Sequence, residues 1–193
     1  MMQLCDDLRV NTTRMVEYWE RAVAAEPWIL PRQLAKPDFV PDLVAAIAEA
    51  TVCLPPTRAS VLALAETAAR HAAGRAAEGA DHARVVIEYY FLRNAIWAYF
   101  GERQRDAGED LQAIVYVDIA VSVATRAALL GYYRREFEAQ GEWPEALDRL
   151  VDEVPLLWDS RPASKAGRAD KAAPASGHRT NDDRETPVRK VKP

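Results

Sequence analysis

The placement of proline constrains this chain more than any other feature. Six prolines fall between Pro27 and Pro56, and none follows until Pro144. Because proline breaks the interior of a helix, the 87 residues between them, 57–143, are free to form long helices. Alanine-rich runs favour helix, and no segment alternates apolar and polar residues long enough to indicate a strand. The sequence therefore predicts an all-α fold, a bundle of five to six helices.

Helix start and stop signals divide the predicted bundle. Thr12, Thr57 and Asp81 are residue types that cap helix N-termini, and Gly79 is a type that ends helices. Since the connection around Gly79 is short, the two helices that flank it are expected to form an antiparallel hairpin. The predicted helices are residues 13–25, a segment opening at Pro41, 57–79, a segment from 81 to about 101, 110–140, and a short segment that opens at 143–145.

The C-terminal segment differs in composition and charge from the rest of the chain. Residues 159–193 contain no Leu, Ile, Phe, Met, Trp or Tyr and carry a net charge of +4, against −8 for residues 1–158. Such a segment cannot offset its ordering entropy by burial, so we expect a disordered basic tail. A basic arm for nucleic acid is the alternative, which the five acidic residues of the tail make unlikely. The predicted organisation is a flexible start, 1–12, a helical domain, 13–158, and the tail.

Charge distribution and cysteine content bear on location. The longest stretch without a charged side chain is eight residues, whereas a membrane-spanning helix needs about 20 apolar residues. The N-terminus places two aspartates where a secretory signal carries positive charge. Cys5 and Cys53 are too few for a disulfide framework. We therefore expect a cytoplasmic protein that does not enter a membrane.

Residues 85–101, VVIEYYFLRNAIWAYFG, are apolar on every side when they are drawn as a helix. A helix of this kind is expected to be central, with its two charged residues, Glu88 and Arg93, at least partly buried. They point about 140° apart around the axis, so they cannot pair with each other. Because a buried unpaired charge is costly, each requires a partner from another helix.

Helix geometry suggests those partners. His71 and Glu88 lie at similar distances from the turn at Gly79, and Arg75 lies one helical turn closer to it. Either basic residue can meet Glu88. On the 110–140 helix, Asp118 falls on the predicted inward face and is the expected acceptor for Arg93.

The run HAAGRAAEGADHARVVIEYYFLRNAIW, residues 71–97, resembles the core signature of the RsbRD-type N-terminal domain. In that family, a helix with a His and an Arg one turn apart is followed by a glycine turn and a helix that reads roughly Glu-aromatic-x-x-Leu-Arg. The likeness extends over about residues 13–140. The positions that match the signature are His71, Arg75, Gly79, Glu88, Tyr89, Leu92 and Arg93, and Asp118 is similar in place on the following helix.

The resemblance implies a non-catalytic regulatory input domain with a distantly globin-like helical bundle that holds no haem. Such domains precede output modules in stressosome co-antagonists, sensor histidine kinases and transcription regulators. No output module follows within these 193 residues, so we expect the domain to act through a partner. The expected partner is a kinase, an anti-sigma-type protein or a transcription regulator, with homodimer formation also open.

Two further readings concern the charged residues themselves. The first is a small-ligand sensor with a pocket among the helices 57–79, 81–101 and 110–140; the second is a purely structural network of ion pairs. The sequence contains no GxGxxG, GxxxxGK[ST], GxSxG or CxxC motif and no metal-ligand spacing, so we expect no catalytic residue, cofactor or metal. The candidate ligand or regulatory residues are His71, Arg75, Glu88, Tyr89, Arg93 and Asp118.

Overall fold

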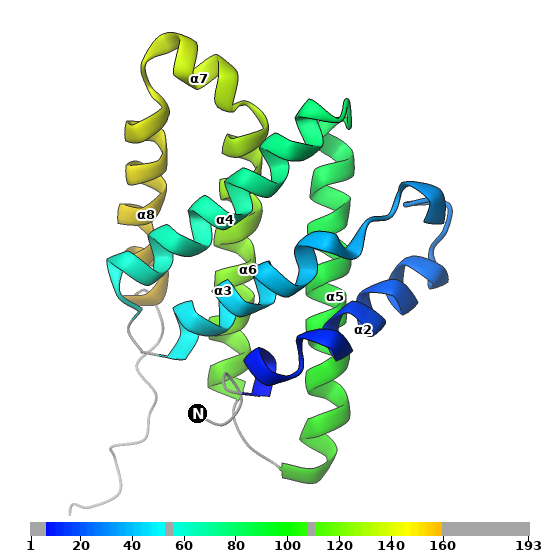
Figure 1. The fold of residues 1–193 in the computed structure, drawn as a ribbon. Helices are drawn as coiled ribbons and strands as arrows, with labels where there is room; N and C mark the ends of the chain where they lie inside the picture. The colour runs from blue at the N-terminus through cyan, green and yellow to red at the C-terminus, as the bar shows by residue number, and fades with distance from the viewer. Residues whose placement is uncertain (1–6, 53–55, 108–110, 160–193) are drawn as a thin grey trace, which may run out of the picture. The chain divides into compact units, whose positions relative to one another are not determined.

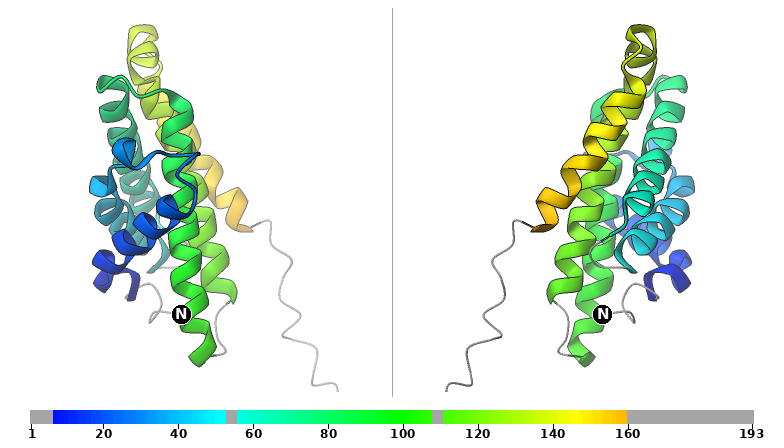
Figure 2. Two further views of the ribbon diagram at one scale, coloured as in Figure 1. Left: turned by 90° about the vertical axis from the view of Figure 1, so that its right-hand side faces the viewer. Right: turned by 90° about the vertical axis from the view of Figure 1, so that its left-hand side faces the viewer.

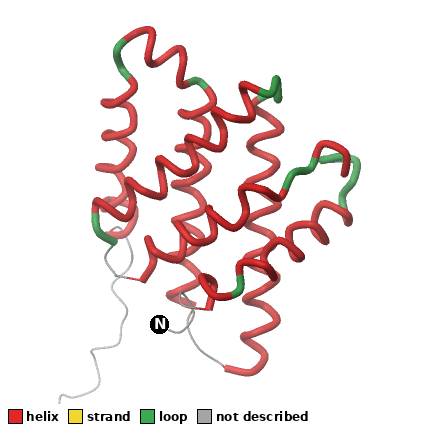
Figure 3. The backbone as a smooth tube through the Cα atoms, viewed as in Figure 1, coloured by secondary structure: helices red, strands yellow, loops and turns green. Residues whose placement is uncertain are grey.

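A computed structural model describes residues 7–52, 56–107 and 111–159, with side chains described as far as residue 154 and not at 103–113. The all-α class is confirmed, and these ranges contain no strand (Figure 3). Short 3-10 turns, η1 and η2, precede α3. The elements are α2 Thr12–Ala25, η1 Arg32–Leu34, η2 Pro37–Phe39, α3 Val40–Val52, α4 Arg58–Ala77, α5 His82–Ala107, α6 Leu111–Tyr132, α7 Arg134–Gln140 and α8 Trp143–Asp159.

The helices of the described region form two layers. Helices α2, α3 and α4 lie side by side and cross over α5, α6 and α8 (Figures 1 and 2). Across the layers, α2 packs on α5 and α4 packs on α6. The predicted antiparallel hairpin of α4 and α5 is wrong, because these helices belong to different layers and meet mainly near the turn at Gly79.

Small residues explain why α4 packs on α6 instead. The α4 face that points inward consists largely of alanine, and at Gly131 of α6 the two backbones come very close. A Cβ atom at Gly131 would lie 2.2 Å from the backbone oxygen of Ala69. This crossing therefore depends on the absence of a side chain at position 131. Within the described residues, the largest fully buried side chains are aromatic: Trp19, Tyr89, Tyr99, Phe91 and Phe100.

Several predicted boundaries need correction. The expected helix 110–140 is broken at Tyr133 into α6 and α7, and the segment expected to be short is the 17-residue α8. The flexible start is wrong for residues 7–10, which are helical, with Leu8 fully buried. Residues 1–6 lie outside the described part of the chain, as do residues 160–193 of the predicted tail.

The predicted capping residues of α4 and α5 and the predicted glycine between these helices are confirmed. The Thr57 hydroxyl accepts a hydrogen bond from the Ser60 backbone N–H at 3.1 Å, and the Asp81 carboxylate accepts one from the Arg84 N–H at 2.7 Å. Gly79 adopts a left-handed backbone with φ of 80°. Thr12, in contrast, is the first residue of α2 and not its cap.

We expect Thr57→Ala to lower the free energy of unfolding by about 0.5–2 kcal/mol, because the Ser60 N–H loses its acceptor. Chemical denaturation followed by circular dichroism measures the change. Thr12→Ala is the matched control, since Thr12 caps no helix, and it should change stability by less than about 0.5 kcal/mol. Equal costs for the two substitutions would contradict this assignment of the caps.

One described segment, Ile114–Tyr132 of α6, is long and apolar enough to cross a membrane, with a mean hydropathy of 1.6. Half of it is buried in the protein. Most of its alanines and valines are buried, and the helix packs against α4 and α5.

Candidate functional site

Glu88 of α5 is the most deeply buried charged side chain in the described region. None of its surface is exposed, and the carboxylate has cationic side chains on two sides. Arg75 Nε donates to Glu88 Oε2 at 3.1 Å, and Arg84 Nε lies 3.4 Å from Oε1, outside hydrogen-bond geometry. The backbone oxygen of Glu88 accepts from Trp19 Nε1 at 3.2 Å. The predicted meeting of Glu88 with Arg75 is confirmed.

Arg75 of α4 connects three parts of the fold. Besides Glu88 on α5, its Nη2 donates to Asp38 Oδ1 at 2.6 Å and to the Lys36 backbone oxygen at 3.1 Å. Its Nη1 donates to Glu78 at 3.3 Å. Burial lowers the pKa of Arg75, but the hydrogen bond to Asp38 and the charge of Glu88 outweigh it, so the pKa lies above its ordinary value. Arg75 is therefore a permanent cation that is only 3% exposed.

Glu78 extends the network of ion pairs around Arg75 to the protein surface. Lys36 Nζ donates to its carboxylate at 2.6 Å, and this hydrogen bond is the largest cause that lowers the pKa of Glu78. A carboxyl whose pKa is lowered on folding stabilises the protein above its unfolded pKa, and this contribution is lost as the pH falls through the folded pKa. Because both side chains are nearly half exposed, the contribution is small.

His71 is buried beside Glu88, but it makes no hydrogen bond with the described residues. Its Nε2 lies 3.2 Å from Glu88 Oε2, which is an ion-pair distance, yet the orientation does not satisfy a hydrogen bond. The ring is 9% exposed and stacks on Phe39, with 4.1 Å between centroids and 19° between planes. Both imidazole nitrogens are shielded from solvent, and a buried polar group without a hydrogen bond costs about 1–3 kcal/mol.

Tyr89 lies in the same region, but its hydroxyl is hydrogen-bonded to the protein backbone. The hydroxyl donates to the Ala68 backbone oxygen at 3.3 Å, and the ring lies 5.7 Å from that of His71. Burial is the main cause that raises the pKa of Tyr89 well above its ordinary value. This phenol is therefore neutral and serves as part of the core.

Arg93 and Asp118 form a second, separate cluster between α5 and α6. Arg93 Nε and Nη2 donate to the two carboxylate oxygens at 2.7 and 2.6 Å, and Trp97 Nε1 donates to Oδ1 at 3.1 Å. The predicted pairing is confirmed. Arg93 is only partly buried, since its side chain is 48% exposed. The predicted site residues thus lie in two places.

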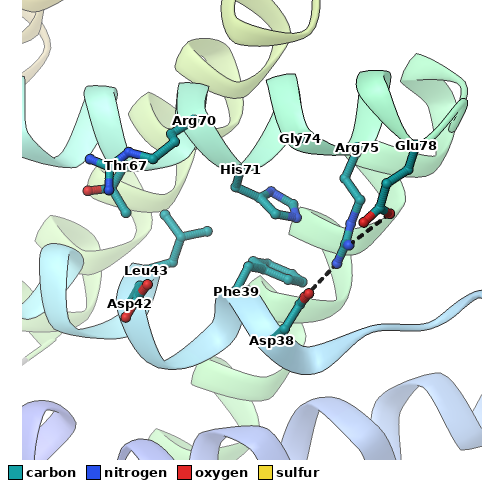
Figure 4. A pocket seen from close by; sticks show the side chains of 10 residues that line it. All are labelled: Asp38, Phe39, Asp42, Leu43, Thr67, Arg70, His71, Gly74, Arg75 and Glu78. Carbon is teal, nitrogen blue, oxygen red and sulfur yellow. Dashed lines mark hydrogen bonds and ion pairs between the residues drawn. The ribbon is translucent and has the colours of Figure 1, made fainter.

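A cavity of about 260 Å³ opens between η2–α3 and α4 (Figure 4). This is not the predicted location, because no residue of α5 or α6 lines it. The stacked rings of His71 and Phe39 lie in its middle, with the ion pairs of Arg75 at one end and Thr67, Arg70 and Asp42 at the other. Its lining residues are Asp38, Phe39, Asp42, Leu43, Thr67, Arg70, His71, Gly74, Arg75 and Glu78.

Sequence reasoning missed the contribution of residues 36–43. Nothing in the local pattern indicates that Asp38 reaches Arg75 or that Phe39 covers His71, since 37 and 32 residues separate these pairs. Pro41 did indicate a helix start there. The partners of the residues around it are a property of tertiary packing.

The outer stripe of α5 is more exposed than predicted. Val86, Tyr90 and Trp97 lie at intervals of four and seven residues, and each is more than one third exposed. Tyr90 is about 200° around the axis from Glu88, so the stripe points away from α4. Val115 of α6 is also exposed. We call Val86, Tyr90, Trp97 and Val115 the outer apolar face.

Comparisons with protein-family models, with curated proteins and with solved structures found no match. Within the described residues, no three His, Cys, Asp or Glu side chains are grouped so that they could hold a metal ion. The buried carboxylate Glu88 is held by cations on two sides, which suits an ion pair better than a general acid.

Proposed function

We propose that this domain is a non-catalytic regulatory module of bacterial signal transduction that acts through contact with another protein. The observation that carries the proposal is the outer apolar face. Tyr90 and Trp97 are 45% and 44% exposed on a helix whose other aromatic residues are buried. Contiguous exposed apolar surface commonly marks a protein interaction site, and Tyr and Trp dominate the energetics of such sites.

The middle of this face suits a specific contact. Arg93 and Asp118 neutralise each other there, so a partner does not face an unpaired charge when it covers the aromatic side chains. An ion pair within an apolar patch also fixes the orientation of a partner. The resemblance of residues 71–97 to the RsbRD-type domain supports a signalling protein as that partner: a kinase, an anti-sigma-type protein or a transcription regulator. Cytoplasmic location belongs to the same proposal.

Site-directed photocrosslinking in living cells tests this proposal. A photoreactive phenylalanine analogue replaces Tyr90, and the adduct is identified by mass spectrometry. We expect a signalling protein of the three classes named above. Trp28, which is 79% exposed outside the outer apolar face, is the matched control position and should give no such adduct. Equal labelling from both positions, or adducts with metabolic enzymes alone, would refute the proposal.

Once the partner is identified, we expect Tyr90→Ala to weaken its binding by about 30-fold. This change corresponds to the loss of roughly 2 kcal/mol from an aromatic hot spot. Trp28→Ala should leave the affinity unchanged. Isothermal titration calorimetry measures both. Since Tyr90 is half exposed, thermal unfolding of the variant should remain close to that of the parent, which separates loss of contact from loss of fold.

A small-ligand sensor is the second candidate function. The cavity beside His71 favours it, because this cavity combines the stacked rings of His71 and Phe39 with charged side chains of both signs.

A further inference from the structure

We propose that the cavity between η2–α3 and α4 binds a small zwitterion of the amino-acid type, with its ammonium group at Asp42 and its carboxylate at Arg70. This inference is independent of the contact made by the outer apolar face. It rests on which charged groups around the cavity are already paired and which are not.

The charged groups at one end of the cavity already form ion pairs with each other. Arg75 is surrounded by Asp38, Glu78 and Glu88, and Lys36 holds Glu78. At the other end, Asp42 and Arg70 are exposed to solvent at the mouth of the cavity, and their side chains have no ion pair or hydrogen bond with any described residue. The free charges of the site are therefore one carboxylate and one guanidinium.

These two free charges come from opposite walls. Asp42 belongs to α3 and Arg70 to α4, with Leu43 and Thr67 beside them in Figure 4. A ligand that satisfies both must carry a cation on the α3 side and an anion on the α4 side. A simple anion would face Asp42 without compensation, and a simple cation would face Arg70. The arrangement thus favours one molecule that carries both charges.

The rest of the cavity fits the remainder of such a molecule. Its volume of about 260 Å³ lies near the lower end for small-molecule sites, which are usually about 300–1,000 Å³. Phe39 and Leu43 offer apolar surface for a short aliphatic side chain. Thr67, which also lines the cavity, offers a hydroxyl group for a hydrogen bond to the carboxylate or ammonium group. The site therefore matches a small amino acid in size and in polarity.

The test begins with the full-length protein and the standard L-amino acids in a thermal-shift screen, followed by titration calorimetry. L-Valine, N-acetyl-L-valine and L-valinamide form a matched series, in which the second compound lacks the cation and the third lacks the anion. The same pair of derivatives is used for any amino acid that binds more tightly. We expect both derivatives to bind at least about tenfold more weakly than the parent compound, because each loses one charged contact.

Variants locate the binding in the cavity. Asp42→Asn and Arg70→Gln should each weaken binding by about tenfold or more. Glu49→Gln on α3 and Arg14→Gln on α2 are matched controls on exposed positions outside the cavity, and they should bind like the parent. Gly74→Ala tests the location of binding in a second way, because Gly74 lines the cavity and an added methyl group narrows it. The methyl group meets no atom within 4 Å, so the fold should be preserved.

Three outcomes would overturn the inference. The first is that no amino acid binds more tightly than about 10 mM. The second is that the N-acetyl and amide derivatives bind as well as the parent amino acid, which would show that the protein does not recognise the two charges. The third is that Asp42→Asn and Arg70→Gln bind normally. A failure of this kind leaves the photocrosslinking result unaffected, so it is distinguishable from a failure of the proposed function.

Discussion

Replacement of Arg75 by methionine is expected to lower the free energy of unfolding by about 3–5 kcal/mol, the largest effect that we predict for a single side chain. The substitution leaves the fully buried carboxylate of Glu88 without its hydrogen-bonded cation. It also releases Asp38 and the Lys36 carbonyl, which Arg75 holds against α4. Urea denaturation followed by circular dichroism measures the loss.

Arg93→Met is the matched control for this prediction. Arg93 makes two short hydrogen bonds to Asp118, but its side chain is about half exposed, so water replaces much of what is lost. The expected cost is at most about 1 kcal/mol. The double variant Arg75→Met/Glu88→Leu should recover part of the stability, because no charge is then left buried. Similar costs for Arg75→Met and Arg93→Met would contradict the difference in burial.

Gly131→Ala is expected to destabilise the protein by about 1–3 kcal/mol or more, although alanine is the better helix former. The reason is the contact between α4 and α6, where the new Cβ atom would lie 2.2 Å from the backbone oxygen of Ala69. A backbone atom in a helix cannot move aside as the end of a flexible side chain can. The two helices must therefore separate, and the alanine face of α4 loses contacts.

Gly74→Ala is the control in the same helix pair. No atom lies within 4 Å of a Cβ atom at Gly74, and the position is helical, so stability should rise by roughly 0.5–1 kcal/mol. Thermal unfolding of the two variants gives opposite shifts if α4 and α6 cross as described. A stabilising effect of Gly131→Ala would show that the crossing is more open than the structure has it.

Local signals in the sequence identified the caps and the charge pairs. Thr57, Gly79 and Asp81 were predictable because capping depends on residues within a few positions of each other. The partners of Glu88 and Arg93 were predictable because few charged residues lie on inward faces of neighbouring helices. These results needed helix geometry alone.

The arrangement of the helices was not predictable in the same way. A short connection at Gly79 requires α4 and α5 to be close at one end, but it does not determine their crossing angle. That angle follows from the fit of the alanines of α4 against α6 at Gly131. The exposure of Tyr90 and Trp97 was missed for a related reason, because periodicity within one helix does not show how many neighbours cover it.

The 26 residues of α5 form a single unbroken helix that has Glu88 on one side and the outer apolar face on the other. A rigid rod of this kind cannot turn or slide on its inner side without the same movement on its outer side. Phe39 of the first layer, which is a wall of the cavity, lies against Tyr89 of this helix, with 5.9 Å between the ring centroids. A ligand that displaced Phe39 would therefore press on α5 at the residue next to Tyr90 of the outer apolar face.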